Sequence, residues 1–150
     1  MAIAFRDYET ERANDFANQA ELLHVASNYP IIEMNISGRD LVKLDIGSPS
    51  DPMVIMMTRQ KGKWEEVDRT EVIDNNPNPQ FIKTFKALYI FELHQDLRFE
   101  VYDADSDSLK LKKHDFIGYA ETDVQTLASN MDLEVVFNLK HDKNITNAAN

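Results

Sequence analysis

After Pro30 the chain alternates apolar and polar residues with period two in seven short stretches, and this pattern constrains the fold most. Successive side chains of a strand point to opposite faces of its sheet, so such alternation is typical of strands that bury one face. Turn-rich pieces separate the stretches, and no long helical pattern lies between them. The sequence therefore predicts an all-β, antiparallel β-sandwich of seven to eight strands. The expected strands contain IIEMNI, MVIMM, WEEVDRTEVI, FKALYIF, LRFEVY, FIGYAETDV and LEVVFNL.

The residues before and after this region have a different composition. Residues 1–29 are rich in Glu, Arg, Ala, Gln and Leu and lack glycine, which favours a helix, although their apolar residues keep only loose helical spacing. We predict an N-terminal extension there that is helical or disordered. The domain itself is expected over residues 30–140, with a short helix near residues 124–130, and residues 141–150 read as a polar tail.

Composition and charge narrow the class of function. The 150 residues are 43% hydrophobic and 28% charged, which is typical of one soluble domain. The absence of cysteine excludes disulfides and thiolate metal sites, and it suits a cytosolic protein. A formal charge of −10 argues against nucleic-acid binding and against constitutive adsorption to an anionic membrane. We expect neither a signal peptide nor a membrane-spanning segment.

Two turn-rich segments, LDIGSPSDP and VYDADSDSLKLKKHDFIG, carry most of the notable carboxylates. Each aspartate alone fits a turn, because its side chain bonds nearby backbone amides. In a sandwich both segments can lie at the same end, where ionised carboxylates repel one another unless a cation neutralises them. Ca²⁺ takes about six to eight oxygen ligands in a flexible cage and suits such a cluster better than Mg²⁺. The candidate metal ligands are Asp45, Asp51, Asp103, Asp105, Asp107 and Asp115.

The spacing of Asp103, Asp105 and Asp107 also matches the first half of an EF-hand loop, but the rest of the segment does not. Ser108 stands where that loop needs glycine, and His114 stands where it needs a bidentate glutamate. The preceding LRFEVY is strand-like instead of helical. We therefore set the EF-hand aside, and we interpret His114 as a solvated loop histidine.

Four elements follow one another along the chain: L-x-x-x-D-x-x-x-x-x-D-P starting at Leu41, the Asn-Pro at Asn78, V-Y-D-x-D starting at Val101, and D-F-I-G starting at Asp115. In these four places the chain resembles the C2 calcium- and lipid-binding domains. Their order and separation make the resemblance specific, and it covers residues 31 to about 139. The details SDPMVIM, WEEVDRTEVI and NPQFIKTF look most like the first C2 domain of a copine.

The resemblance implies which of the aspartates bind calcium. The loop between Asp105 and Asp115 looks longer than the family pattern, and Asp107 stands where an alternative ligand could be supplied, so Asp107 and Asp115 both stay open as the last ligand. The implied ligands are Asp45 and Asp51 in the first loop, with Asp103, Asp105 and Asp115 in the third.

The number of strands leaves one question about the fold. Such a sandwich normally has eight strands, and the pattern supplies seven. The eighth could come from beyond Asn150, from the polar tail or from a partner chain, or a sheet edge could stay open.

The resemblance also implies calcium-dependent binding to anionic phospholipid membranes. Without calcium the acidic tip would repel anionic headgroups, and with calcium it would attract them. The leucines of the third loop could enter the membrane interface while its lysines meet phosphates, or they could pack on the sandwich while the lysines solvate the loop. The candidate lipid-binding residues are Ile46, Pro49, Leu109, Lys110, Leu111, Lys112 and Lys113, with Lys83 and Lys86 as a further basic pair on a strand.

We predict a binding module and no enzyme, because the chain contains no G-x-S-x-G, P-loop, G-x-G-x-x-G or H-E-x-x-H motif. The alternative is a calcium-independent protein-interaction module of the same fold. The copine resemblance implies a further C2 domain and a von Willebrand A-like module in the full-length chain. It also implies a cytoplasmic protein that is recruited to the plasma membrane or endomembranes when calcium rises.

Overall fold

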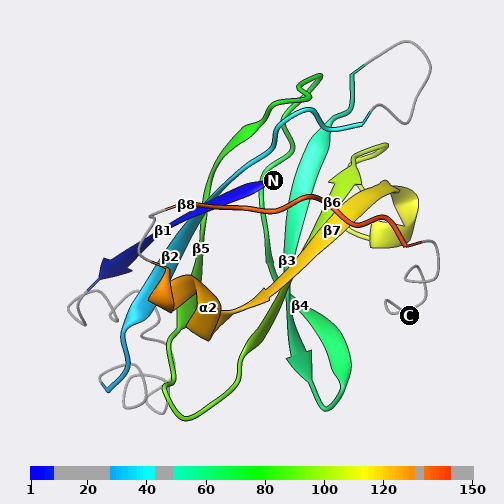
Figure 1. The fold of residues 1–150 in the computed structure, drawn as a ribbon. Helices are drawn as coiled ribbons and strands as arrows, with labels where there is room; N and C mark the ends of the chain where they lie inside the picture. Colours follow the sequence, from blue (N-terminus) through cyan, green and yellow to red (C-terminus); the bar gives the residue numbers. More distant parts are fainter. Residues whose placement is uncertain (9–27, 43–48, 131–133, 143–150) are drawn as a thin grey trace.

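The computed structural model describes residues 1–8, 28–42, 49–130 and 134–142, and in these residues two four-stranded antiparallel sheets pack face to face (Figure 1). The first sheet has the strand order β5-β2-β1-β8, and the second has the order β4-β3-β6-β7. The strands are β1 (Ala2–Tyr8), β2 (Ile31–Ser37), β3 (Pro52–Gln60), β4 (Lys63–Arg69), β5 (Gln80–Leu88), β6 (Asp96–Asp103), β7 (Asp115–Asp123) and β8 (Glu134–Val136).

The predicted all-β sandwich is confirmed, and each of the seven expected strands is present. The short helix is also present as α2 (Val124–Ser129), which begins after Asp123 because that carboxylate accepts a hydrogen bond from the Thr126 backbone N–H at 2.7 Å. A short 3₁₀ helix, η2 (Leu111–Lys113), lies in the loop between β6 and β7. In the described part of the chain, no helix is both long and apolar enough to cross a membrane.

The prediction of a helical or disordered extension is wrong for the first residues of the chain. Residues 2–8 form β1, which lies between β2 and β8 and pairs Ala2 with both Ser37 and Val136. Ile3 is completely buried between the sheets, so pairing and burial outweigh the local helix preference. Residues 9–27 of the predicted extension lie outside the described residues.

β1 also answers the question of the eighth strand. The N-terminal residues supply it, and the segment after β8 crosses from the first sheet to β7, where Lys140 bridges Tyr119 (Figure 1). Gly118 permits this close approach, because a Cβ there would lie 2.9 Å from the Lys140 carbonyl oxygen.

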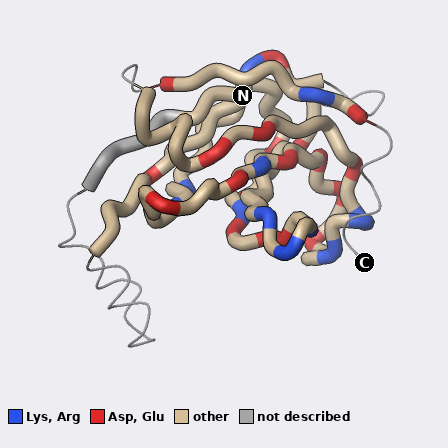
Figure 2. Tube along the Cα trace, turned by 60° about the horizontal axis from the view of Figure 1, so that its bottom comes forward, with Lys and Arg blue, Asp and Glu red and all other residues tan. Residues whose placement is uncertain are grey.

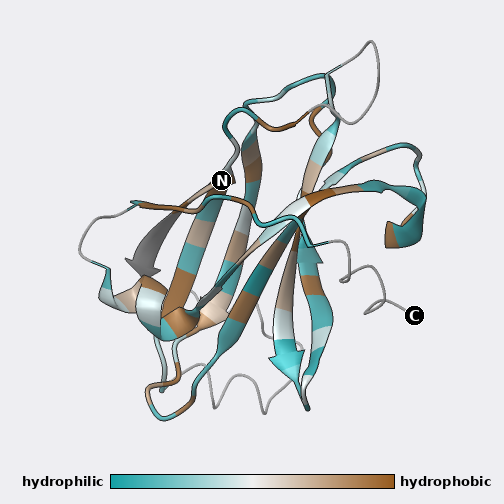
Figure 3. Ribbon diagram, turned by 45° about the vertical axis from the view of Figure 1, so that its right-hand side comes forward, coloured by the Kyte–Doolittle hydropathy of each residue, from teal (hydrophilic) through white to brown (hydrophobic). Residues whose placement is uncertain are grey.

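Apolar residues recur along the strands (Figure 3). Their buried side chains form the core between the sheets. At the centre the rings of Phe85 and Phe99 lie 6.0 Å apart, and both side chains are fully buried. A second cluster covers the outer face of the second sheet, where β3 alternates its side chains away from the core. It contains Met53, Ile55 and Met57, with Trp64, Tyr102 and Leu111 packed against them.

Glu71 closes part of the open edge of β5. Its two carboxylate oxygens accept the backbone N–H groups of Ile82 at 2.5 Å and Lys83 at 3.1 Å, where the register between β2 and β5 shifts. Burial opposes ionisation of Glu71, but the hydrogen bonds from Ile82, Lys83 and its own backbone outweigh it and lower the pKa of this carboxyl. The carboxylate thus satisfies two backbone donors of β5, which is an edge strand of the first sheet in the described residues.

We expect Glu71→Gln to lower the free energy of unfolding by less than about 1 kcal/mol, because the group is partly exposed and solvent screens its interactions. Since folding lowers the pKa of Glu71, its contribution is present above the unfolded pKa of about 4.3 and is lost as the pH falls through the folded value. Urea unfolding should separate wild type from the variant at about pH 7 and bring them together near pH 3. Glu65→Gln, on the exposed face of β4, is the control; a difference that persists in acid would contradict the assignment.

Candidate functional site

The strand registers bring three of the predicted ligands to one end of the sandwich. Asp103 is the last residue of β6 and pairs with Pro52 at the start of β3 on one side and with Asp115 at the start of β7 on the other. Asp51 directly precedes Pro52. We call this end the tip. Asp105 follows Asp103 by two residues and is exposed.

Asp51 and Asp103 hold neighbouring loops together. The backbone N–H of Asp51 donates to Oδ1 of Asp103 at 2.7 Å, and the Asp51 carbonyl accepts the N–H of Ala104 at 2.9 Å. Oδ1 of Asp51 in turn accepts the N–H of Asn75 at 2.6 Å. Asp103 is only 5% exposed, so its carboxylate is oriented by the fold before any ligand binds.

The connection between β4 and β5 also lies at the tip, which the sequence interpretation missed. Asn75 has a left-handed backbone, with φ of 52°, and donates to Asp51, while Asn76 donates its N–H to the Ser50 carbonyl at 3.1 Å. Asparagine tolerates this conformation better than most residues. The turn-forming run NNPNP between two expected strands was the available signal.

His114 is a structural residue, and its interpretation as a solvated loop histidine is wrong. Its side chain is buried at 8% exposure, and Nδ1 accepts the backbone N–H of Asp105 at 3.3 Å. Nε2 therefore carries the proton and donates to the Ser108 carbonyl at 2.7 Å. The imidazole thus closes the loop after β6 from the inside.

The remaining part of the third loop separates into exposed and packed side chains. Leu109 is 78% exposed, and its three neighbouring lysines are exposed as well. Leu111 is half-buried and packs against Met53, Ile55 and Met57, so for this leucine the structure favours packing on the sandwich. The exposed lysines are Lys110, Lys112 and Lys113.

The other predicted residues of the tip are placed only in part. Asp45 and Ile46 lie outside the described residues. Pro49 is half-buried beside Ser50, and Asp107 is exposed in the third loop. Within the described ranges, no three acidic or histidine side chains are already arranged as a metal-binding group. The structure therefore brings the predicted ligand segments to one end without a preformed cage among the described side chains.

Charged residues are not confined to the tip. Basic and acidic residues are interspersed along much of the chain (Figure 2). The predicted basic pair on β5 follows this pattern: Lys83 Nζ lies 2.9 Å from Asp68, and Lys86 Nζ lies 3.2 Å from Glu33. Both lysines line a groove of about 720 Å³ between the sheets on the β4–β5 side. Each is therefore paired with a carboxylate before any headgroup arrives.

Comparisons with known proteins agree with this architecture. A sequence model of the C2 domain matches residues 32–139. Nicotinic receptor-associated protein 1 of Caenorhabditis elegans is 40% identical over 60% of this chain and 17% of that protein. The chain thus spans about a sixth of the length of this curated relative.

Two solved structures illustrate the shared fold. The RIM C2A domain from Drosophila has a TM-score of 0.54 at 14% identity, over 87% of this chain and 86% of that one. The C2A and C2B domains of extended-synaptotagmin 2, in calcium-bound form, have a TM-score of 0.51 at 23% identity, over 65% of this chain and 35% of that one. At these identities the similarity concerns the fold.

Proposed function

This chain belongs to the C2 domain family, and on that premise we propose that it binds Ca²⁺ at the tip and then binds anionic phospholipid membranes. The register of β6 carries the proposal, because it sets Asp103 between the strand that follows Asp51 and the strand that begins with Asp115. Aspartate oxygens are the ligands that calcium prefers in proteins. The residues that would hold the ion are Asp45, Asp51, Asp103 and Asp105, with Asp115 or Asp107.

Bound calcium would supply positive charge that offsets the carboxylates of the tip. The chain itself supplies the remaining membrane contacts. Leu109 offers an exposed apolar side chain, and Lys110, Lys112 and Lys113 offer charges for lipid phosphates. Leu111 serves as the packed anchor of the loop instead of entering the membrane. Ile46 and Pro49 of the first loop complete the proposed surface, and Lys83 and Lys86 remain a secondary, already paired site.

Co-sedimentation with liposomes across a calcium titration tests this function. Wild type should sediment with phosphatidylserine vesicles only when calcium is present and should stay in the supernatant with neutral phosphatidylcholine vesicles. High salt should weaken the binding, since part of it is electrostatic. Binding that does not depend on calcium, or no binding together with an unchanged melting temperature in calcium, would refute the proposal.

Two single variants decide which carboxylate completes the third loop. Asp115 pairs with the buried Asp103, whereas Asp107 lies further along the exposed part of the loop, so we propose Asp115 as the ligand. Asp115→Asn should weaken calcium binding by about tenfold or more, and Asp107→Asn by less than about threefold, because a direct ligand contributes far more than a nearby charge. Calorimetric titration without vesicles measures both; the reverse order would assign the role to Asp107.

The wider context belongs to the same proposal. The copine-like details of the sequence suggest that a further C2 domain and a von Willebrand A-like module accompany this domain. The match covers only 17% of the curated relative, so a protein of that length has room for further modules. The protein would act without catalysis, in the cytoplasm, and would move to the plasma membrane or endomembranes when calcium rises. Expression of the full-length protein with a fluorescent tag, imaged during a calcium ionophore pulse, tests the relocation.

A calcium-independent protein-interaction module is the second candidate function. The observation that favours it is that Asp51 and Asp103 each accept a backbone N–H, so both carboxylates have a structural role without any cation. On this alternative, calcium leaves both the melting temperature and membrane binding unchanged. The titration described above therefore separates the two candidates.

A further inference from the structure

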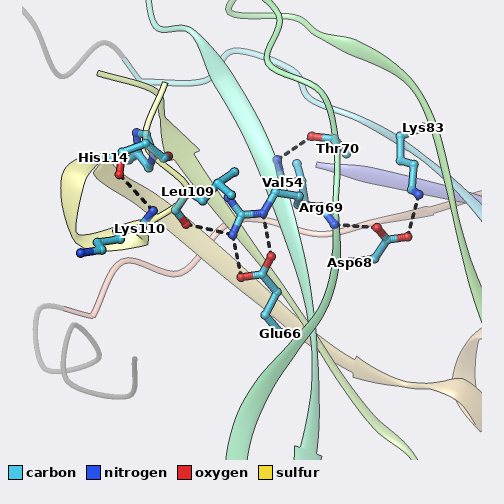
Figure 4. A network of polar contacts seen from close by, with 10 residues as sticks. Val54, Glu66, Asp68, Arg69, Thr70, Lys83, Leu109, Lys110 and His114 are labelled. Carbon is cyan, nitrogen blue, oxygen red and sulfur yellow. Dashed lines mark hydrogen bonds and ion pairs between the residues drawn. The ribbon is translucent and has the colours of Figure 1, made fainter. Parts of the chain in front are cut away.

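The third loop is attached to β4 by the side chain of Arg69 (Figure 4). Nε and Nη2 of Arg69 donate to the two carboxylate oxygens of Glu66 at 2.7 and 2.8 Å. Nη2 also donates to the Leu109 carbonyl at 3.2 Å, across 40 residues of sequence. Because Nη2 carries two hydrogens, the bidentate pair with Glu66 orients the guanidinium so that the second hydrogen meets the loop.

Three consecutive parts of this loop are therefore held by different elements. His114 holds the Ser108 carbonyl from inside the loop, Arg69 holds the Leu109 carbonyl from β4, and Leu111 packs on the outer face of the second sheet. All of these contacts are made by the protein alone. Protein groups thus define the conformation of the loop at Ser108, Leu109 and Leu111.

The side chain of Leu109 does not share in this packing. Its carbonyl is hydrogen-bonded, yet the residue is 78% exposed and is followed by the exposed Lys110. A large apolar side chain exposed to water contributes favourable free energy when an apolar phase, such as the interior of a membrane, covers it. Because the backbone of Leu109 is already fixed, less conformational entropy is lost when the loop binds.

We propose that Arg69 is a positioning residue for membrane binding, which holds the third loop so that the side chain of Leu109 stays exposed. This inference rests on the proposed function and deepens it. The apolar part of the membrane contact is built by Arg69, Glu66 and the loop itself. On this proposal, calcium changes the charge of the tip, and it does not change the apolar contact made by Leu109.

Arg69→Lys tests the proposal, because lysine keeps the positive charge but loses the planar fork that reaches Glu66 and Leu109 together. At saturating calcium, its binding to phosphatidylserine vesicles should weaken about three- to tenfold, as expected for one lost charge-assisted hydrogen bond. Calcium binding without vesicles should not change. Arg59→Lys is the matched control, since Arg59 is an exposed strand arginine that lies over Trp64 and should bind as wild type.

A double-mutant cycle shows whether Arg69 acts through Leu109. Leu109→Ala alone should weaken vesicle binding, and Arg69→Lys should add little in that background, because its effect is already lost. An equal further loss would overturn the proposal. Amide hydrogen exchange without calcium or vesicles gives a second reading: the amides of Lys110, Lys113 and His114 should exchange faster in Arg69→Lys, and unchanged exchange would also overturn it.

The outcomes distinguish this inference from the function on which it rests. If wild type fails to bind anionic vesicles in calcium, the proposed function is refuted and the membrane role of Arg69 with it. If wild type binds and Arg69→Lys binds equally well, only the positioning role is refuted.

Discussion

Asp103→Asn is expected to remain folded and to lose the calcium response of the protein. Asparagine keeps an oxygen that can accept the Asp51 N–H, so the contact between the two loops survives while the charge is removed. Asp103 is buried between β3 and β7, so the two neighbouring strands hold its side chain in place. Calcium affinity should fall by about a hundredfold or more, as expected when a central carboxylate ligand is neutralised.

Calorimetric calcium titration and liposome co-sedimentation measure the effect, with thermal unfolding as the check on the fold. Glu134→Gln, an exposed position on β8 at the edge of the first sheet, removes the same charge and should leave the calcium response intact. If both variants lowered binding equally, the net charge of the domain would account for it. If Asp103→Asn kept the wild-type response, Asp103 would be a loop-bonding residue only.

Arg98→Ala is expected to cause the largest loss of stability of any single polar substitution proposed for this chain. Arg98 and Glu100 lie on the outer face of β6, with side chains only 4% and 6% exposed and Nε 3.1 Å from Oε1. The guanidinium also lies 4.0 Å from the ring centre of Tyr119. Removal of the arginine leaves the Glu100 carboxylate buried and without its cation, and this should lower the free energy of unfolding by about 3–5 kcal/mol.

A double variant separates charge burial from lost packing. Arg98→Met/Glu100→Gln removes both charges, fills much of the same volume and keeps an acceptor for the Tyr102 hydroxyl, which now donates to Glu100 at 2.7 Å. Burial and then this carboxylate raise the pKa of Tyr102, so the tyrosine stays a neutral donor. The double variant should recover most of the loss in urea unfolding. If it is as unstable as Arg98→Ala, contacts with Tyr119 and Trp64 dominate instead.

The sequence was sufficient to predict that the aspartate segments meet at one end of the sandwich, but not which side chains hold the loops there. The order of the aspartate segments along alternating strands placed Asp51, Asp103 and Asp115 at one end, because strand polarity and sandwich topology leave few other arrangements. The roles of His114 and Asn75 could not be predicted. Both act through bonds to backbone atoms of other loop residues, and such bonds follow from the folded path of the chain instead of from residue type.

The sequence by itself determined the sandwich, its seven alternating strands, the short helix after Asp123 and the acidic end, because period, turn residues and helix caps are local properties. Only the tertiary structure decided that residues 2–8 complete the first sheet. It also decided that Arg98 and Glu100 are buried and that Arg69 holds the third loop. In each case the deciding contact joins residues that only the fold brings together. The stabilisation from this contact outweighs the local preference of the residues for a helix or for solvent exposure.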